Sequence, residues 1–210
     1  MDKTSKMADN KRTLTAEAWA RAALETIARD GVDSVAVESL ARELDVTKGS
    51  FYWHFPSRDA LLDAALKLWE RQETEGLLAR VGNETDPYKR IVRAFTKVDA
   101  SQHASRLYLA LSAAGAHHPK IAEVVRRVSE SRLDHLLEGY RALGLGEEDA
   151  ARWAAHAYSV YLGILHLRHD VPDALPEYGS PAYQGYMQHL IATLIPETHA
   201  REAQIRMKVA

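Results

Sequence analysis

The chain has 210 residues, of which 46% are hydrophobic and 27% charged, a composition that excludes a disordered chain and suits one or two small domains. It contains no cysteine, which excludes disulfides, thiolate metal sites and cysteine nucleophiles and is the usage expected of a cytoplasmic protein. The formal net charge is −2, and residues 1–60 hold nine Lys/Arg against ten Asp/Glu, so any DNA-binding surface needs locally placed basic groups.

The pattern of apolar residues predicts an all-α protein. Residues 1–12 lack an apolar segment, so they are expected to form a flexible arm and not a secretory signal. No run of about 18 apolar residues occurs, so no membrane span is expected. Period-2 alternation and hairpin turns are missing, while apolar residues recur at spacings of three and four.

Capping signals place the first helices. Thr15 is a good N-cap for a helix that Gly31 ends. Two short helices are expected at about 37–44 and 48–54, the second capped by Thr47. A residue before proline is driven out of the α region, so Phe55-Pro56 ends that helix, and a long fourth one follows from Ser57.

The remainder of the chain predicts five further helices. Pro87, Pro119 and Pro181 each stand at a position that suits the first turn of a helix. The expected bounds are about 87–102, 105–114, 119–143, 147–169 and 181–194, which gives about nine helices in all.

Two short helices joined by a tight turn are typical of a helix-turn-helix, whose second helix reads the major groove of DNA. The third helix carries polar and aromatic groups suited to phosphates and base edges. The alternative is that its aromatic run, residues 51–55, is simply core. Five consecutive ring residues cannot all face one core, however, so some must be exposed.

The segment 31–62 closely resembles the N-terminal domain of the TetR family of bacterial regulators. The resemblance covers roughly residues 14–65 and rests on ordered elements: Gly31, Leu40-Ala41, the run Val46-x-x-Gly49-x-Phe51-Tyr52-Trp53-His54-Phe55, and Ser57-Arg58-x-x-Leu61-Leu62. It implies a homodimer that binds a palindromic operator in double-stranded DNA and a C-terminal domain that binds a small-molecule effector.

The resemblance also implies which residues contact DNA: Thr47, Lys48, Gly49, Ser50, Tyr52, Trp53, His54 and Arg58. The chain departs from the family pattern at the second helix. Ala36 replaces the usual capping Thr, Glu38 stands where many members carry Arg, and Asp45 replaces the turn Gly. A carboxylate at 38 would face phosphates unfavourably, so we expect the third helix, Arg58 and the arm cations Lys3, Lys6, Lys11 and Arg12 to carry most of the binding.

The C-terminal helices are apolar on more than one face, and Gly163 would let another helix approach closely. The alternatives are a thick monomer core and a dimer interface, and the resemblance favours the dimer. Ring and imidazole side chains in the surrounding helices suit an effector pocket. The candidates are Trp69, Phe95, His103, Tyr108, His117, Trp153, His156 and Tyr158.

No cofactor, metal site or catalytic site is expected. His166 and His169 lie three residues apart on one helix, but a zinc site usually needs three or four ligands. No nucleophile motif such as Gly-x-Ser-x-Gly is present.

The sequence therefore predicts a cytoplasmic DNA-binding regulator, expected to be a repressor that releases its operator when an effector binds. Its expected parts are an arm (1–12), a DNA-binding domain (13–57) and a helical ligand-binding and dimerisation domain (58–210). The alternative function is a small-molecule or metal sensor with weak or secondary DNA binding.

Overall fold

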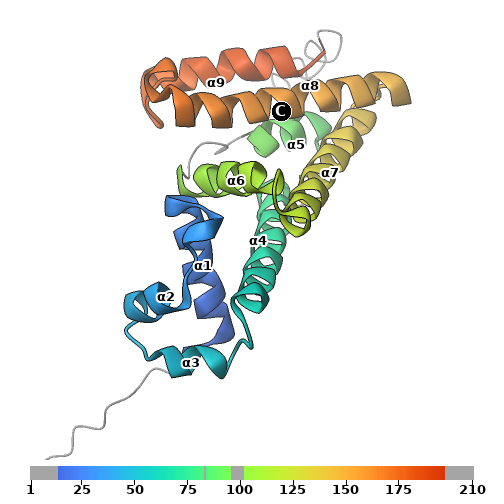
Figure 1. Ribbon diagram of the computed structural model, residues 1–210. Helices are drawn as coiled ribbons and strands as arrows, with labels where there is room; N and C mark the ends of the chain where they lie inside the picture. Colours follow the sequence, from blue (N-terminus) through green and yellow to red (C-terminus); the bar gives the residue numbers. More distant parts are fainter. Residues whose placement is uncertain (1–13, 83, 96–101, 197–210) are drawn as a thin grey trace, which may run out of the picture.

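The computed structural model describes residues 14–82, 84–95 and 102–196, which contain nine α-helices and two short 3-10 turns (Figure 1). The predicted all-α class is thereby confirmed. The helices are α1 (Ala16–Asp30), α2 (Val37–Glu43), α3 (Lys48–Tyr52), α4 (Arg58–Val81), α5 (Pro87–Phe95), α6 (Gln102–Gly115), α7 (Pro119–Ala142), α8 (Glu147–Asp170) and α9 (Pro181–Leu194). The 3-10 turns, at Val32–Ser34 and Pro172–Ala174, were not predicted.

Local signals set the ends of α1 and the start of α4 as predicted, whereas the predicted side-chain cap at Thr47 is wrong, because that side chain makes no capping bond. The Ala18 amide donates to the Thr15 hydroxyl at 3.2 Å, which caps α1, and Gly31 ends this helix with a φ of 86°. Asp45 takes a left-handed φ of 53° in the turn before α3, which an Asp tolerates better than most residues. Ser57 caps α4 by accepting a bond from the Ala60 amide.

Three expected bounds differ from the structure. Helix α3 ends at Tyr52 and not at 54, because the His54 amide donates to the Phe51 carbonyl and tightens the chain into a turn before Pro56. Helix α5 ends at Phe95, and the rest of its expected span, up to 101, lies outside the described residues. Helix α6 begins three residues early, at Gln102.

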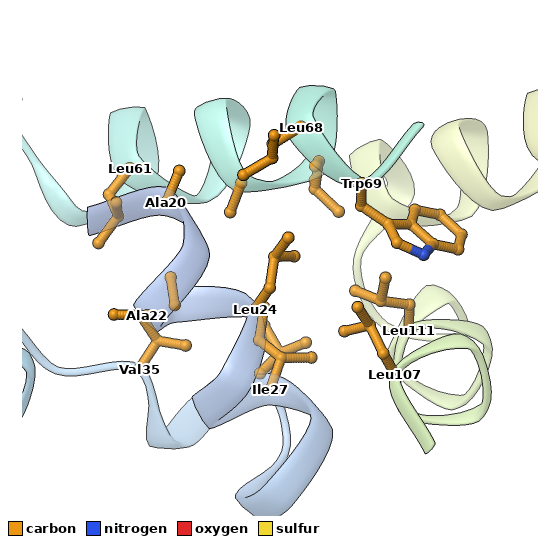
Figure 2. Packing of buried hydrophobic residues seen from close by; sticks show 14 of the residues in the cluster. Ala20, Ala22, Leu24, Ile27, Val35, Leu61, Leu68, Trp69, Leu107 and Leu111 are labelled. Atoms are coloured by element: carbon orange, nitrogen blue, oxygen red, sulfur yellow. The ribbon is translucent and has the colours of Figure 1, made fainter. Parts of the chain in front are cut away.

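One hydrophobic core joins the helix-turn-helix to the helices that follow it. Trp19 and Phe51 are fully buried in this core together with Leu61 and Trp69 of α4. Figure 2 shows side chains of α1, α4 and α6 converging, with Leu24 and Ile27 between them. Packing is therefore not interrupted at residue 57, and the domain boundary expected there stays a prediction.

A second core lies at the opposite end of the molecule, where α5 and α7 pack against α8 and α9 (Figure 1). Its centre is Tyr140, which is fully buried and donates from its hydroxyl to the Leu194 carbonyl at 2.8 Å. Burial raises the pKa of Tyr140 well above its ordinary value, so this hydroxyl stays protonated. None of the described helices is long and apolar enough to span a membrane.

Candidate DNA interface and effector site

The predicted recognition residues lie on one outward surface around α3. Five of them are exposed and two, Ser50 and His54, are half-buried; the exposed ones are Thr47, Lys48, Gly49, Tyr52 and Trp53. Thr47 precedes the helix, but its side chain makes no capping bond. The hydroxyl of Thr47 is therefore not committed to α3.

The aromatic run divides between core and solvent. Phe51 is fully buried and meets the Trp19 ring edge-on at 5.4 Å, and Phe55 packs against Phe51 at 5.7 Å. Trp53, by contrast, is 89% exposed and Tyr52 56%. Large exposed rings of this kind mark interaction surfaces, and the interpretation of the whole run as core is wrong.

Lys48 is engaged by Glu38 across the turn between α2 and α3. The Lys48 ammonium donates to the Glu38 carboxylate. This hydrogen bond and the attraction between the charges lower the pKa of Glu38 and raise the pKa of Lys48. Both groups are charged at neutral pH and cancel one another, so the one lysine on the recognition helix contributes little net positive charge.

Arg58 braces the helix-turn-helix from inside. Its Nε donates to the Val35 carbonyl and its Nη2 to the Val32 carbonyl, each at 2.7 Å. These bonds tie the start of α4 to the turn that follows α1. We had expected the Arg58 side chain to be directed at phosphate; the structure shows it directed at backbone carbonyls, and a phosphate contact stays a prediction. The arm cations Lys3, Lys6, Lys11 and Arg12 lie outside the described residues.

Four of the eight predicted effector residues come together where the two cores meet: Trp69 and Tyr108 of the first core, and Phe95 and Tyr158 of the second. The Tyr108 and Tyr158 hydroxyls lie 3.2 Å apart, and the Trp69 and Tyr108 rings 6.3 Å apart. Phe95 and Tyr158 line a cavity of about 30 Å³ between α5, α7 and α8, together with Ala94, Arg132, His135, Leu136 and Tyr161. Burial raises the pKa of Tyr158 to about 12, so its hydroxyl is neutral.

The other four predicted effector residues do not join this cluster. His103 pairs with Glu25 of α1 at 3.1 Å, and His117 is exposed in the turn between α6 and α7. Trp153 packs against Tyr140 at 6.1 Å, and the neighbouring His156 is exposed. Their residue types suit a pocket, but the helix faces on which they lie direct them to solvent or to the second core.

Arg132 is the central residue that sequence reasoning missed. It is only 9% exposed, its Nη2 donates to the Glu73 carboxylate, and its guanidinium lies over the rings of Tyr108 and Tyr161 at 5.1 and 4.9 Å. Burial works against the charge, but Tyr161 and Glu73 outweigh it and hold the pKa of Arg132 above its ordinary value. A signal existed in the sequence, because Arg132 occupies an apolar-stripe position of α7 between Val128 and Leu136.

Three ion pairs connect α4 to α7. Asp63 pairs with Lys120 at 3.1 Å, Glu70 with Arg127 at 2.6 Å, and Glu73 with Arg132. The first pair lies near the helix-turn-helix and the last at the aromatic cluster. We call these three pairs the α4–α7 ladder.

An exposed strip of small residues runs along one face of α8. Ala155, Ser159 and Gly163 face solvent, and a Cβ added to Gly163 would meet no atom within 4 Å. His166 of the same helix lies 3.7 Å from the Asp170 carboxylate. Within the described ranges no group of three or more His, Asp or Glu could hold a metal ion.

The N-terminal part of the sequence matches a known protein family. Residues 20–72 match the family model for bacterial regulatory proteins of the tetR family. The uncharacterized HTH-type transcriptional regulator YwcC of Bacillus subtilis is 30% identical over 97 residues, which are 46% of this chain and 42% of that protein. The chain thus matches less than half the length of its curated relatives.

Solved structures share the fold over most of the chain. A TetR transcriptional regulator from Legionella pneumophila has a TM-score of 0.67 at 17% identity, covering 91% of this chain and 100% of its own. A transcriptional regulator from Saccharomonospora viridis, solved in complex with choline, has a TM-score of 0.68 at 18% identity, covering 86% and 94%. The N-terminal segment, residues 20–72, thus matches the tetR family of bacterial regulatory proteins and forms a helix-turn-helix, and the chain shares its overall fold with solved transcriptional regulators.

Proposed function

We propose that this protein represses transcription by binding a palindromic operator as a homodimer and releases it when a small molecule binds. The observation that carries the DNA-binding part is the outward pair Tyr52 and Trp53 above a buried Phe51. In a helix-turn-helix, the recognition helix lies in the major groove with such side chains at base edges and phosphates. Thr47, Lys48, Gly49, Ser50 and His54 share that surface and would add polar contacts.

A mobility-shift assay tests this proposal, with DNA from upstream of the protein's own gene as the probe. The wild-type protein is expected to shift the probe, and the double variant Tyr52→Ala/Trp53→Ala to lose the shift while keeping its helical content. The control is Tyr178→Ala, which removes an exposed ring in the loop before α9. Equal affinity of wild type and double variant would refute the recognition surface.

The exposed strip Ala155, Ser159 and Gly163 supports the homodimer, because small residues let a second helix approach closely. A dimer would place two copies of α3 about 34–36 Å apart to enter successive major grooves. Helices α8 and α9 lie side by side at the end of the molecule remote from α3 (Figure 1). Pairing through these helices would leave both recognition surfaces free.

The aromatic cluster around Arg132 supports effector binding, and the choline complex of the Saccharomonospora viridis regulator shows that a protein of this fold holds a small molecule. Effector binding would act through α4, which carries Arg58 at its first turn and Glu73 near the cluster. The α4–α7 ladder joins the two, so a ligand that favours one arrangement of α4 shifts the dimer population toward release.

A second candidate, a sensor with weak or secondary DNA binding, is favoured by the Glu38–Lys48 pair. A salt titration of operator affinity separates the two functions, since each phosphate contact contributes about 0.9 to the slope of log K against log salt. A slope that corresponds to only one or two phosphate contacts per dimer would favour the sensor.

A further inference from the structure

We propose that the effector carries a carboxylate and that Arg132 binds it from the cavity beside Phe95 and Tyr158. The inference rests on the proposed function and names the chemical class of its ligand. It starts from buried hydrogen-bond donors that no acceptor satisfies in the described structure.

Two buried N–H groups in the aromatic cluster have no partner: Nη1 of Arg132 and Nε1 of Trp69. Both side chains flank the ring of Tyr108, the guanidinium at 5.1 Å and the indole at 6.3 Å. A buried donor without an acceptor costs free energy, and the cost is greater for a charged group. Native proteins normally satisfy such groups with protein, water or ligand.

Hydroxyl groups of the cluster lie beside the guanidinium and can donate to a ligand. Ser129, Tyr108 and Tyr158 form a chain with oxygen separations of 3.4 and 3.2 Å. Tyr158 also interacts with Ser129, so the three hydroxyls form one cluster whose protons can reorient toward an added acceptor. The Glu73 carboxylate is already bound to Nη2 of Arg132.

The guanidinium already occupies the position that a cationic ligand would take, because it lies between the rings of Tyr108 and Tyr161. A ligand cation would meet like charge there. A carboxylate, by contrast, would accept from Nη1 and from a hydroxyl, and such charge-assisted bonds are among the strongest that a site can offer.

The cavity of about 30 Å³ has room for little more than a head group. The body of the ligand would have to displace apolar neighbours such as Leu136 or Phe95. Because Glu73 of α4 shares the guanidinium, a ligand carboxylate at Arg132 competes with the last pair of the α4–α7 ladder. Effector binding would thereby reach the helix that carries Arg58.

Calorimetric titration of the full chain tests the inference, with acetate, octanoate, decanoate and benzoate as carboxylate probes. Benzamide is the neutral counterpart and choline the cationic one. At least one carboxylate is expected to bind, with benzamide and choline at least about tenfold weaker.

Variants separate a direct contact from a general change in folding. The double variant Glu73→Gln/Arg132→Gln removes both charges together and is expected to weaken carboxylate binding by about tenfold or more. Tyr158→Phe keeps the ring and is expected to weaken it several-fold, whereas Tyr178→Phe, an exposed tyrosine elsewhere, leaves it unchanged.

Three results would overturn the inference: no carboxylate binds, choline binds more tightly than every carboxylate, or both cluster variants bind carboxylate like wild type. A mobility-shift assay of the unliganded protein tests DNA binding separately, so failure of this inference can be distinguished from failure of the proposed function. A protein that shifts DNA but binds no carboxylate is a repressor with a different effector class. One that binds carboxylate through Arg132 but shifts no DNA retains this inference and loses the proposed repression.

Discussion

Phe51 and Trp53 stand two positions apart in the chain yet occupy opposite environments, one fully buried and the other 89% exposed. Trp53 directly follows α3 and keeps helical backbone angles. Residues two positions apart in a helical conformation are about 200° apart around the axis, so the Phe51 ring anchors α3 to Trp19 while the Trp53 ring faces outward. Charged side chains near α3 also have separate roles. Arg58 binds backbone carbonyls of the helix-turn-helix, and Lys48 pairs with Glu38.

Removal of the Arg58 side chain is predicted to lower the stability of the folded protein. Arg58→Ala removes two hydrogen bonds to half-buried carbonyls and is expected to lower the free energy of unfolding by about 2–3 kcal/mol. Denaturant titration measures this. Arg42→Ala is the control, because Arg42 reaches only the Ser39 hydroxyl, at 3.4 Å, on the surface. Equal losses for the two variants would contradict the brace.

Glu38 binds the Lys48 ammonium, so removing the Glu38 carboxylate is predicted to tighten DNA binding. Glu38→Gln frees the ammonium for phosphate and is expected to raise operator affinity about three- to tenfold at low salt, with a steeper salt dependence. Glu43→Gln makes the same charge change on α2, next to Arg29 and not Lys48. If both variants raise affinity equally, the effect is one of overall charge and not of this pair.

At the scale of elements, α4 is the connection between the two candidate sites. Its first turn holds the helix-turn-helix through Arg58, its middle packs in the first core through Leu61, Ala65 and Trp69, and its acidic side chains pair with α7. The bidentate pair of Glu70 with Arg127, at 2.6 and 2.9 Å, lies at the middle of the ladder.

This pair predicts a pH-dependent contribution to stability. The hydrogen bond from Arg127 lowers the pKa of Glu70 in the folded state. The contribution is therefore present above the unfolded value of about 4.3 and is lost as the pH falls through the folded pKa. Glu70→Gln is expected to cost about 0.5–1 kcal/mol at pH 7 and progressively less in acid, measured by denaturant titration.

A matched change on an exposed pair provides the control for Glu70. Glu130 pairs with Arg126 on the surface of α7, and Glu130→Gln is expected to cost at most about 0.5 kcal/mol. A difference between wild type and Glu70→Gln that does not shrink in acid would contradict the ion pair as its source.

At the scale of the whole molecule, two cores lie at opposite ends, and α8, which carries the exposed strip, lies at the end remote from α3 (Figure 1). Gly163 on that strip has no neighbour within 4 Å of an added Cβ. A larger side chain there would leave the fold of one chain undisturbed and obstruct a partner helix.

Gly163→Leu is therefore expected to disrupt the proposed homodimer and yield a monomer, measured by light scattering after size-exclusion chromatography. Replacing a helical glycine raises helix propensity by about 0.8–1 kcal/mol, so the stability of the single chain should not fall. Ala113→Leu, on an exposed face of α6, is the control and should keep the wild-type oligomeric state. An unchanged dimer in Gly163→Leu would exclude this strip from the interface.

The sequence by itself determined most of the helices and the match of the N-terminal segment to the tetR family. Caps such as Thr15 and Ser57 and the breaks at Gly31 and Pro56 act locally, through hydrogen bonds and backbone angles that depend on a few neighbouring residues. The ordered run from Gly31 to Leu62 was likewise readable without coordinates, although the charge of the segment gave no indication of a DNA-binding surface.

The tertiary structure alone decided what each polar side chain contacts. Glu38 meets Lys48 ten residues later, Arg58 meets Val32 twenty-six residues earlier, and Arg132 meets Glu73 of another helix. Of the eight predicted effector residues, the structure brings four together and separates four. The residue type alone does not determine which face of a helix packs inward. Such contacts depend on how α4, α7 and α8 are placed relative to one another, and that placement results from burial of both cores together.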